Sequence, residues 1–127
     1  MSGLLVDTNV LVDHLRGVPQ AGEYLQAVTE DISVSSVTVA ELHAGVRDEE
    51  ERASLRTFVS SFRVIPADGA ICEMGGVFRS RYGASHGLDL IDAIIAATSV
   101  ARQIALVTLN KRHFPMLKQI IVPYVHR

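Results

Sequence analysis

Polar residues that could do chemistry together lie in four separate stretches of the sequence. The first is Asp7, directly after the apolar run 4–6; the others are Glu41 in 38–42, Asp92 in 88–97 and Asn110 in 106–110. In open parallel α/β sheets, ligands bind at the carboxyl ends of the strands. Three carboxylates that met at such an edge without cations would repel each other. An oxygen-rich cluster of this kind predicts a site for Mg²⁺ or Mn²⁺.

Asp92 carries the strongest signal. It lies in the otherwise apolar segment 91–97, and no Lys or Arg lies within a helical turn of it. A buried carboxylate must be protonated, paired or bound to a metal. The alternative is a solvated acid in the first turn of a helix, which the helix dipole favours. The small residues Ala93, Ala96 and Ala97 indicate tight packing against the sheet, which favours a functional role.

Asp7 and Glu41 each have a purely structural alternative. An Asp at a strand-to-helix turn is commonly the N-cap of the helix. Thr8 or Asn9 can cap this helix instead, so we expect Asp7 to point freely into the crevice. Thr38 and Glu41 have the spacing of a capping box, in which the Glu reaches back to the helix start. The spacing leaves this structural role and a role in the site equally open for Glu41.

Asp89 and Asn110 are secondary candidates. If a helix begins at Leu90, Asp89 is its N-cap and Asp92 its third residue, and Asp89 could also be a metal ligand. Thr108 and Asn110 follow a predicted strand, where a hydroxyl and an amide could hold a metal-bound water or a neighbouring carboxylate. They could equally be turn residues that cap the next short helix.

Strands alternate with helices along the whole chain. The pattern predicts strands at 4–6, 32–35, 62–65 and 104–107, with a fifth edge strand at 120–122. It predicts helices from residue 8 or 9 to Gly17, and at 21–28, 38–46, beyond the acidic run 48–51, at 68–85 and at 90–102. The alternation indicates one α/β domain over residues 1–127, with a central, mostly parallel sheet of four or five strands.

The predicted helix 68–85 has an apolar face that we expect to point inward. Its Gly75-Gly76 pair suggests a close approach to another element, and Cys72 is expected to be buried. The inward residues are Ile71, Met74, Val77, Phe78 and Tyr82. We expect the remaining acids to be solvated or capping residues: Asp13, Asp31, Asp68 and the run 48–51.

The composition excludes several classes of protein. The 127 residues are 48% hydrophobic, and their formal net charge of -2 argues against a sequence-reading DNA-binding domain. Because no apolar run is long enough for a signal peptide or a membrane span, we expect a cytoplasmic protein. The single cysteine excludes an internal disulfide, and the five histidines lack a metal-binding spacing. Four basic residues could still contact a nucleic-acid backbone: Arg79, Arg81, Lys111 and Arg112.

Four motifs together resemble the PIN-domain nucleases, and among these the VapC-type toxins of prokaryotic toxin–antitoxin pairs. The motifs are Leu5-Val6-Asp7-Thr8-Asn9-Val10-Leu11, Val37-Thr38-Val39-Ala40-Glu41-Leu42, Asp92-Ala93-Ile94-Ile95-Ala96-Ala97-Thr98 and Leu106-Val107-Thr108-Leu109-Asn110-Lys111-Arg112-His113-Phe114. They are specific in combination, and they follow the family's order over nearly the whole chain. The resemblance implies a three-layer α/β/α sandwich and a Mg²⁺- or Mn²⁺-dependent endoribonuclease that cuts RNA.

The same resemblance implies roles for individual residues. Asp7, Glu41 and Asp92 correspond to the acids that define the family's metal site, and Asn110 matches its Thr-x-Asn element. Many relatives carry a further acid three residues after that Asn, where this chain has His113. Asp89 is a candidate substitute for the missing acid. The resemblance also implies a homodimer and a cognate antitoxin whose C-terminal segment occupies the active groove.

Two other functions compete with the nuclease. A catalytically inactive module of the same fold would use the acids as helix caps or as a surface that docks RNA or the antitoxin. Phosphoryl transfer with Asp7 as nucleophile is the second alternative. The sequence disfavours it, because no second Asp follows two residues after Asp7 and no paired acids lie near the start of the chain.

Overall fold

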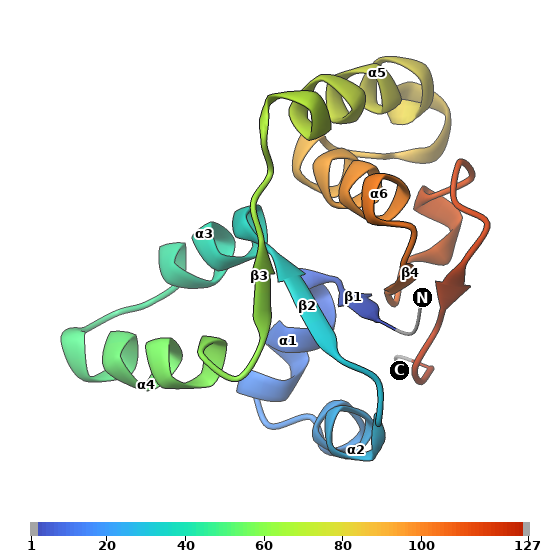
Figure 1. The fold of residues 1–127 in the computed structure, drawn as a ribbon. Coiled ribbons are helices and arrows are strands. Elements are labelled where there is room, and N and C mark those ends of the chain that lie inside the picture. Colours follow the sequence, from blue (N-terminus) through green and yellow to red (C-terminus); the bar gives the residue numbers. More distant parts are fainter. Residues whose placement is uncertain (1–2, 126–127) are drawn as a thin grey trace.

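The central feature of the fold is an all-parallel sheet of five strands, seen in a computed structural model that describes residues 3–125. The strands are β1 (Leu4–Val6), β2 (Ile32–Ser35), β3 (Arg63–Ile65), β4 (Ala105–Val107) and β5 (Ile120–Ile121). Their order across the sheet is β3-β2-β1-β4-β5, with β1 in the middle (Figure 1). The predicted parallel sheet is therefore confirmed, including its fifth edge strand.

Six α-helices connect the strands within the described residues. They are α1 (Thr8–Leu15), α2 (Pro19–Ala27), α3 (Ser36–Ala44), α4 (Glu49–Val59), α5 (Gly69–His86) and α6 (Leu90–Arg102), and a short 3₁₀ helix, η1 (Lys111–His113), follows β4. Helix α2 starts at Pro19 rather than at residue 21 as predicted. Proline suits this position because its φ is already helical and the first helical N–H needs no partner.

The side chains of each strand point alternately to the two faces of the sheet, and a hydrophobic core lies on each face. Leu5 and Leu106 pack with α6, whereas Leu4, Val6 and Val107 pack with α1, α3 and α4. Successive strand side chains point to opposite faces, so each buried strand supplies both cores. Figure 1 shows α5 and α6 on one side of the sheet and α1 and α2 on the other. This is the three-layer α/β/α sandwich that the resemblance implied.

Helix α5 packs on α6. Gly75 is buried against α6, which confirms the predicted close approach, while Gly76 faces open space. Ile71 is buried as expected, but Val77 is 41% exposed. The prediction for Val77 was wrong because α5 packs mainly against α6, so a narrower stripe of the helix is covered than the apolar pattern indicated.

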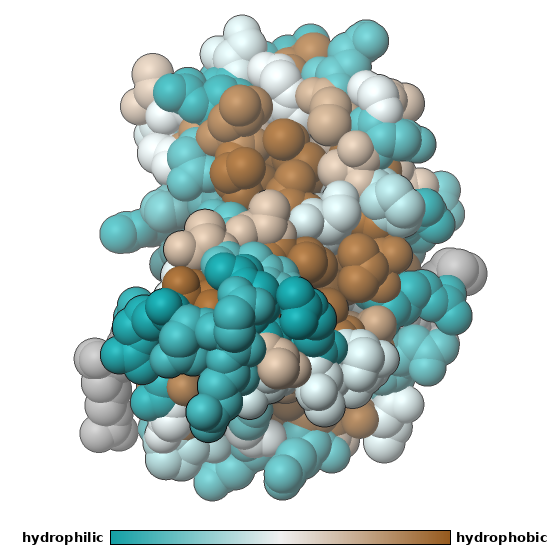
Figure 2. Space-filling view, turned by 90° about the vertical axis from the view of Figure 1, so that its left-hand side faces the viewer, coloured by the Kyte–Doolittle hydropathy of each residue, from teal (hydrophilic) through white to brown (hydrophobic). Residues whose placement is uncertain are grey.

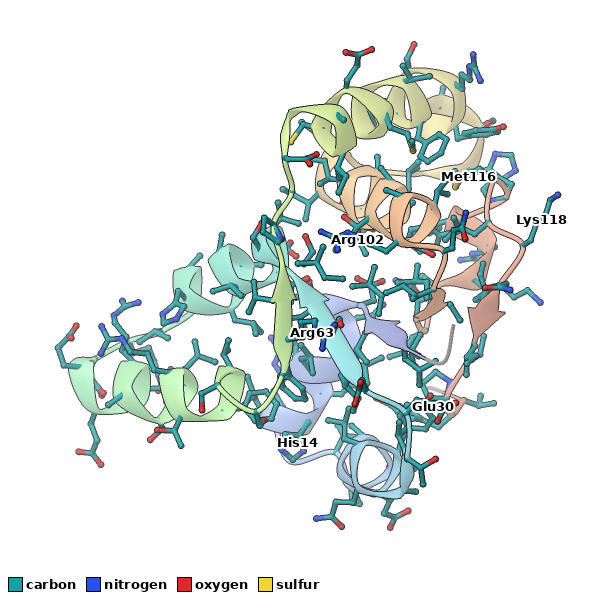
Figure 3. All side chains as sticks on the ribbon, in the orientation of Figure 1. His14, Glu30, Arg63, Arg102, Met116 and Lys118 are labelled. Atoms are coloured by element: carbon teal, nitrogen blue, oxygen red, sulfur yellow. The ribbon has the colours of Figure 1, made fainter. Side chains whose placement is uncertain are left out.

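Two further expectations about burial were wrong. Cys72 is exposed on α5, and its thiol donates to the backbone oxygen of Ala67 at 3.6 Å. Asp13 is buried on α1 and accepts a hydrogen bond from the hydroxyl of Tyr124, at 2.9 Å. Neighbouring His14, labelled in Figure 3, stacks on Phe58 of α4 with ring centroids 5.2 Å apart. The burial of Asp13 depends on a contact with a residue 111 positions away, whereas Cys72 lies on a side of α5 that no other described element covers. Within residues 3–125 no helix is both long and apolar enough to cross a membrane.

We expect Tyr124→Phe to lower the free energy of unfolding by about 1–2 kcal/mol, because Asp13 would lose a hydrogen bond inside the protein. Urea denaturation at neutral pH measures the change. Tyr82→Phe is the matched control, since Tyr82 packs its ring edge-on against His86 and its hydroxyl makes no hydrogen bond within the described residues. Equal stability losses in the two variants would contradict the assigned role of the Tyr124–Asp13 contact.

Candidate functional site

The candidate site lies where the order of the strands reverses. The chain runs outward from β1 to β2 and β3, then returns to place β4 on the other side of β1. Asp7 follows β1 and Thr108 follows β4, and the backbone N–H of Asp7 donates to the carbonyl of Val107 at 2.9 Å. Such a reversal leaves a crevice at the carboxyl ends of the strands, which is the usual ligand site of open α/β sheets.

Asp7 is buried at this point and both of its carboxylate oxygens have donors. Oδ1 accepts the backbone N–H of Thr8 at 2.8 Å, and Oδ2 accepts the hydroxyl of Thr108 at 2.8 Å. Asp7 is therefore the N-cap of α1, so the prediction that Thr8 or Asn9 would cap this helix was wrong. The two bonds fix the carboxylate of Asp7, and they confirm that Thr108 holds a neighbouring carboxylate.

Glu41 is turned toward the same crevice. The predicted capping box was wrong: Ser35 caps α3 by accepting the N–H of Val37 at 3.2 Å, and Thr38 is fully buried within the helix. Glu41 Oε1 instead lies 2.7 Å from Thr8 Oγ1. This role of Thr8 was not predicted from the sequence, although its place directly after Asp7 was the available signal.

Asp89 and Asp92 enter the site together at the start of α6. Asp89 is the N-cap, and its Oδ1 accepts the backbone N–H of Asp92 at 2.8 Å. This confirms the predicted capping geometry, with Asp92 as the third helical residue. The Asp89 side chain is exposed and that of Asp92 is half-buried.

The four acids interact electrostatically. Burial raises the pKa of Asp7 to about 6, with Glu41 and Asp89 adding to the effect and the bonds from Thr108 and Thr8 opposing it. Burial, then repulsion from Asp7, Asp89 and Glu41, raises the pKa of Asp92 to about 7. The ion pairs within residues 3–125 are Arg47–Glu51 and Arg52–Glu49, and neither includes one of the four acids. None of the four acids therefore has an ion-pair partner among the described Lys, Arg and His side chains.

Asn110 and His113 lie beyond β4. Asn110 is exposed, and its backbone N–H, not its side chain, donates to Thr108 Oγ1 at 3.1 Å. His113 stands where the resemblance implied a further acid, and its Nδ1 is buried without a hydrogen-bond partner in the described part of the chain. The structure thus brings Asp7, Glu41, Asp89 and Asp92 into one electrostatic cluster, while it leaves the Asn110 amide at the surface.

The donor set suits a hard divalent cation. All its candidate ligands are oxygens. A bound cation would stabilise the ionised forms of Asp7 and Asp92, whose pKa values are raised first by burial and then by repulsion among the acids. Residues 3–125 contain no group of three or more acidic, His or Cys side chains already arranged to hold a metal. Mg²⁺ commonly takes only one or two carboxylates and completes its shell with water and substrate phosphate. Asp7 and Asp92 would be those two carboxylates.

A groove of about 810 Å³ runs from Glu41 along α1, α3 and α4. Its walls combine the apolar side chains of Val12, Leu42 and Leu55 with the charged side chains of Arg16 and Arg47. Figure 2 views the molecule from the α3–α4 side and shows hydrophilic side chains gathered over α4, with hydrophobic surface beside them. The groove could therefore take an extended partner with both apolar and charged groups.

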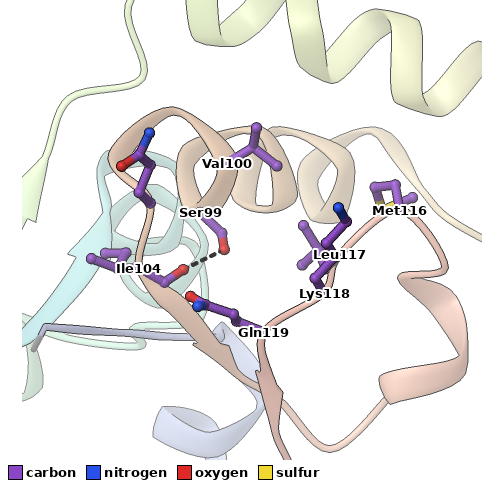
Figure 4. Close-up of a pocket in the computed structure, with 8 residues that line it drawn as sticks. Ser99, Val100, Ile104, Met116, Leu117, Lys118 and Gln119 are labelled. Atoms are coloured by element: carbon purple, nitrogen blue, oxygen red, sulfur yellow. Dashed lines mark hydrogen bonds between the residues drawn. The ribbon is translucent and has the colours of Figure 1, made fainter. Parts of the chain in front are cut away.

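A second cavity, of about 520 Å³, lies at the far end of α6 from Asp92 (Figure 4). Ser99 and the segment 116–119 contribute to its lining, and the Ser99 hydroxyl donates to the carbonyl of Ile104 at 2.6 Å. No carboxylate of the described residues lines this cavity. It is therefore separate from the acidic cluster.

Residues 4–118 match the PIN domain family, and the chain belongs to that family. Among its relatives, Ribonuclease VapC10 of Mycobacterium tuberculosis is 41% identical over 124 residues, which cover 95% of this chain and 92% of that protein. Ribonuclease VapC19 of the same organism is also 41% identical over 124 residues, with coverages of 94% and 98%.

Solved structures are similar over the same extent. A toxin–antitoxin complex from Klebsiella pneumoniae contains a chain that superposes with a TM-score of 0.83 at 29% identity, covering 97% of this chain and 99% of the other. DNA-bound VapBC from Salmonella typhimurium gives a TM-score of 0.78 at 26% identity, with coverages of 94% and 97%. The resemblance to PIN-domain proteins, inferred from four motifs, is confirmed.

Proposed function

We propose that this protein is a metal-dependent endoribonuclease that acts in the cytoplasm as the toxin of a toxin–antitoxin pair. The observation that carries the proposal is the cluster of Asp7, Glu41, Asp89 and Asp92 at the strand reversal. No described cation forms an ion pair with any of these four acids. The 41% identity to two proteins named as ribonucleases supports RNA as the substrate.

In this proposal Asp7 and Asp92 hold a Mg²⁺ or Mn²⁺ ion, with Glu41 bound directly or through water. A metal bound there would supply Lewis-acid activation of water for in-line attack on the phosphodiester, and it would offset charge on the phosphate. Thr108 and the Thr8 N–H fix the orientation of Asp7. Asp89 acts through the start of α6, because its Oδ1 already accepts the N–H of Asp92. At neutral pH the cluster retains protons, which cation binding would release.

The groove beside Glu41 supports an antitoxin as partner. A partner segment lying along Val12, Leu42 and Leu55 would reach Glu41 directly, so it could block the site while it binds. Complexes of toxin and antitoxin are among the similar structures. The homodimer remains a proposal drawn from the family.

The experiment that tests the proposal is cleavage of structured and single-stranded RNA by the purified protein with Mg²⁺, with Mn²⁺ and with EDTA. Metal-dependent cleavage that purified antitoxin suppresses is the expected result. RNA binding without cleavage, whichever metal is supplied, would instead favour the catalytically inactive docking module. Cleavage that persists in EDTA would contradict the metal requirement.

Lys111 and Arg112 are expected to contact the RNA backbone, because both are exposed in η1, directly after Asn110. Changing both to Gln should flatten the dependence of log affinity on log salt by about 1.4, since each phosphate contact on a single strand contributes about 0.7. Fluorescence anisotropy in an Asp92→Asn background measures this without cleavage.

A matched control for that experiment is the exchange of Arg102 and Lys118 for Gln. Both residues are exposed, and their exchange likewise removes one Arg and one Lys. Figure 3 labels them near the far end of α6. An equal change of salt dependence in the two double variants would contradict a specific role for η1.

A further inference from the structure

Thr8 contacts two acids of the cluster at once. Its backbone N–H donates to Asp7 Oδ1 at 2.8 Å, and its hydroxyl lies 2.7 Å from Glu41 Oε1. We propose that Thr8 is a positioning residue that holds Glu41 beside Asp7 for metal binding and catalysis. The inference rests on the proposed nuclease function, and it assigns a role to a residue that is not itself a ligand.

Glu41 needs such a partner because its own position is loosely determined. The residue is exposed on α3, and a Glu side chain has several rotatable bonds that solvent does not restrain. The hydroxyl of Thr8 is the hydrogen-bond partner that the described structure gives to its carboxylate. Without that hydroxyl, Glu41 would populate rotamers directed away from Asp7.

The direction of the hydrogen bonds follows from counting protons. Thr8 Oγ1 also lies 2.9 Å from Oγ1 of Thr38, which is fully buried on α3. An ionised carboxylate only accepts, and each hydroxyl has one proton. Thr8 therefore donates to Glu41 and accepts from Thr38, so the chain Thr38–Thr8–Glu41 has a single orientation while Glu41 is ionised. This arrangement ties α1 to α3 across the site.

As a consequence, the carboxylates of two acids from different elements are held in a fixed position relative to each other. Asp7 belongs to the end of β1 and Glu41 to the middle of α3, and Thr8 bonds to both. Groups that orient metal ligands through hydrogen bonds typically contribute about 10- to 100-fold to metal affinity or activity. A hydroxyl is required for this, whereas the Thr8 methyl group is not.

The test compares Thr8→Val, which removes the hydroxyl at nearly constant shape, with Thr8→Ser, which keeps it. Mn²⁺ affinity is measured from the electron paramagnetic resonance signal of free Mn²⁺, and kcat and KM are measured on cleaved RNA. We expect Thr8→Val to weaken Mn²⁺ binding and to lower kcat by about tenfold each. Thr8→Ser should restore both to within about threefold of wild type.

Thr57→Val is the matched control, because Thr57 makes its hydrogen bond to Ala53 on exposed α4, away from the cluster. Thermal unfolding shows whether each variant folds. Mn²⁺ affinity unchanged in a folded Thr8→Val protein would overturn the inference, as would an equal loss in Thr8→Ser.

A double variant shows whether Thr8 affects Mn²⁺ affinity through Glu41 or independently of it. In a Glu41→Ala background, Thr8→Val should cause no further loss of Mn²⁺ affinity. A further tenfold loss would overturn the inference, because Thr8 would then act without Glu41. Should the wild type bind Mn²⁺ but cut no RNA, the proposed function fails while these affinities still decide the role of Thr8. A wild type that binds no Mn²⁺ overturns both.

Discussion

Replacing Asp92 by Asn is expected to reduce RNA cleavage by at least about a hundredfold while the protein stays folded. The change keeps the shape of a half-buried side chain whose backbone N–H is already bonded to Asp89. It removes one of the two carboxylates proposed to hold the metal, and with it the charge stabilisation at the phosphate. Single-turnover cleavage with saturating Mn²⁺ measures the loss.

The same substitution should stabilise the metal-free protein at high pH. Asp92 has a folded-state pKa of about 7 against an ordinary value of 3.8, so the folded state binds this proton more tightly than the unfolded state. The stabilisation that protonated Asp92 gives to the folded wild-type protein is fully present below about pH 4, and it is lost as the pH rises through 7. Because solvent screens a half-buried group, we expect Asp92→Asn to gain about 1–2 kcal/mol at pH 8 and nothing at pH 4.

Asp31→Asn is the matched control, since Asp31 is an exposed acid at the other end of the strands. It should leave cleavage unchanged and show no such pH-dependent gain. Mn²⁺ should raise the thermal midpoint of the wild type but not of the Asp92→Asn variant. If that variant cleaved RNA within a few-fold of the wild-type rate, Asp92 would not belong to the site.

The second large effect is expected from Gly75→Ala. A Cβ at this position would lie 2.8 Å from Ile94 Cγ1 and 3.0 Å from Ile94 Cα. The Cα belongs to the backbone of α6, so no side-chain rotation relieves the overlap and α5 must move away from α6. We expect the free energy of unfolding to fall by about 2 kcal/mol, as in other overpacked cores.

Gly76→Ala is the internal comparison, because the two glycines are adjacent in α5 and differ only in what surrounds them. A Cβ on Gly76 meets nothing within 4 Å. Alanine is the better helix former, so this variant should gain about 0.5–1 kcal/mol. Urea denaturation of the pair measures the difference. Equal effects would mean that α5 and α6 are not packed as closely as the structure has them.

Local patterns were sufficient for much of the fold. The alternation of strands and helices predicted a mostly parallel sheet of four or five strands, and the structure has five, all parallel. The Asp89–Asp92 spacing predicted the start of α6 correctly. Periodicity and capping depend on residues a few positions apart, which the sequence displays directly. Predictions from local patterns were wrong where two nearby residues could each have been the N-cap of a helix. Asp7 rather than Thr8 caps α1, and Ser35 rather than Thr38 caps α3.

The sequence by itself determined which acids the protein has and which strand or helix end carries each one. Only the tertiary structure decided their partners: Thr108 for Asp7, 101 positions away, and Thr8 for Glu41, 33 positions away. It also decided that Asp13 is buried beneath Tyr124 and that Cys72 is exposed. The physical reason is that the contacts of Asp7 and Glu41 depend on the strand order β3-β2-β1-β4-β5, which brings distant segments to one edge of the sheet. Spacing along the chain does not contain that order.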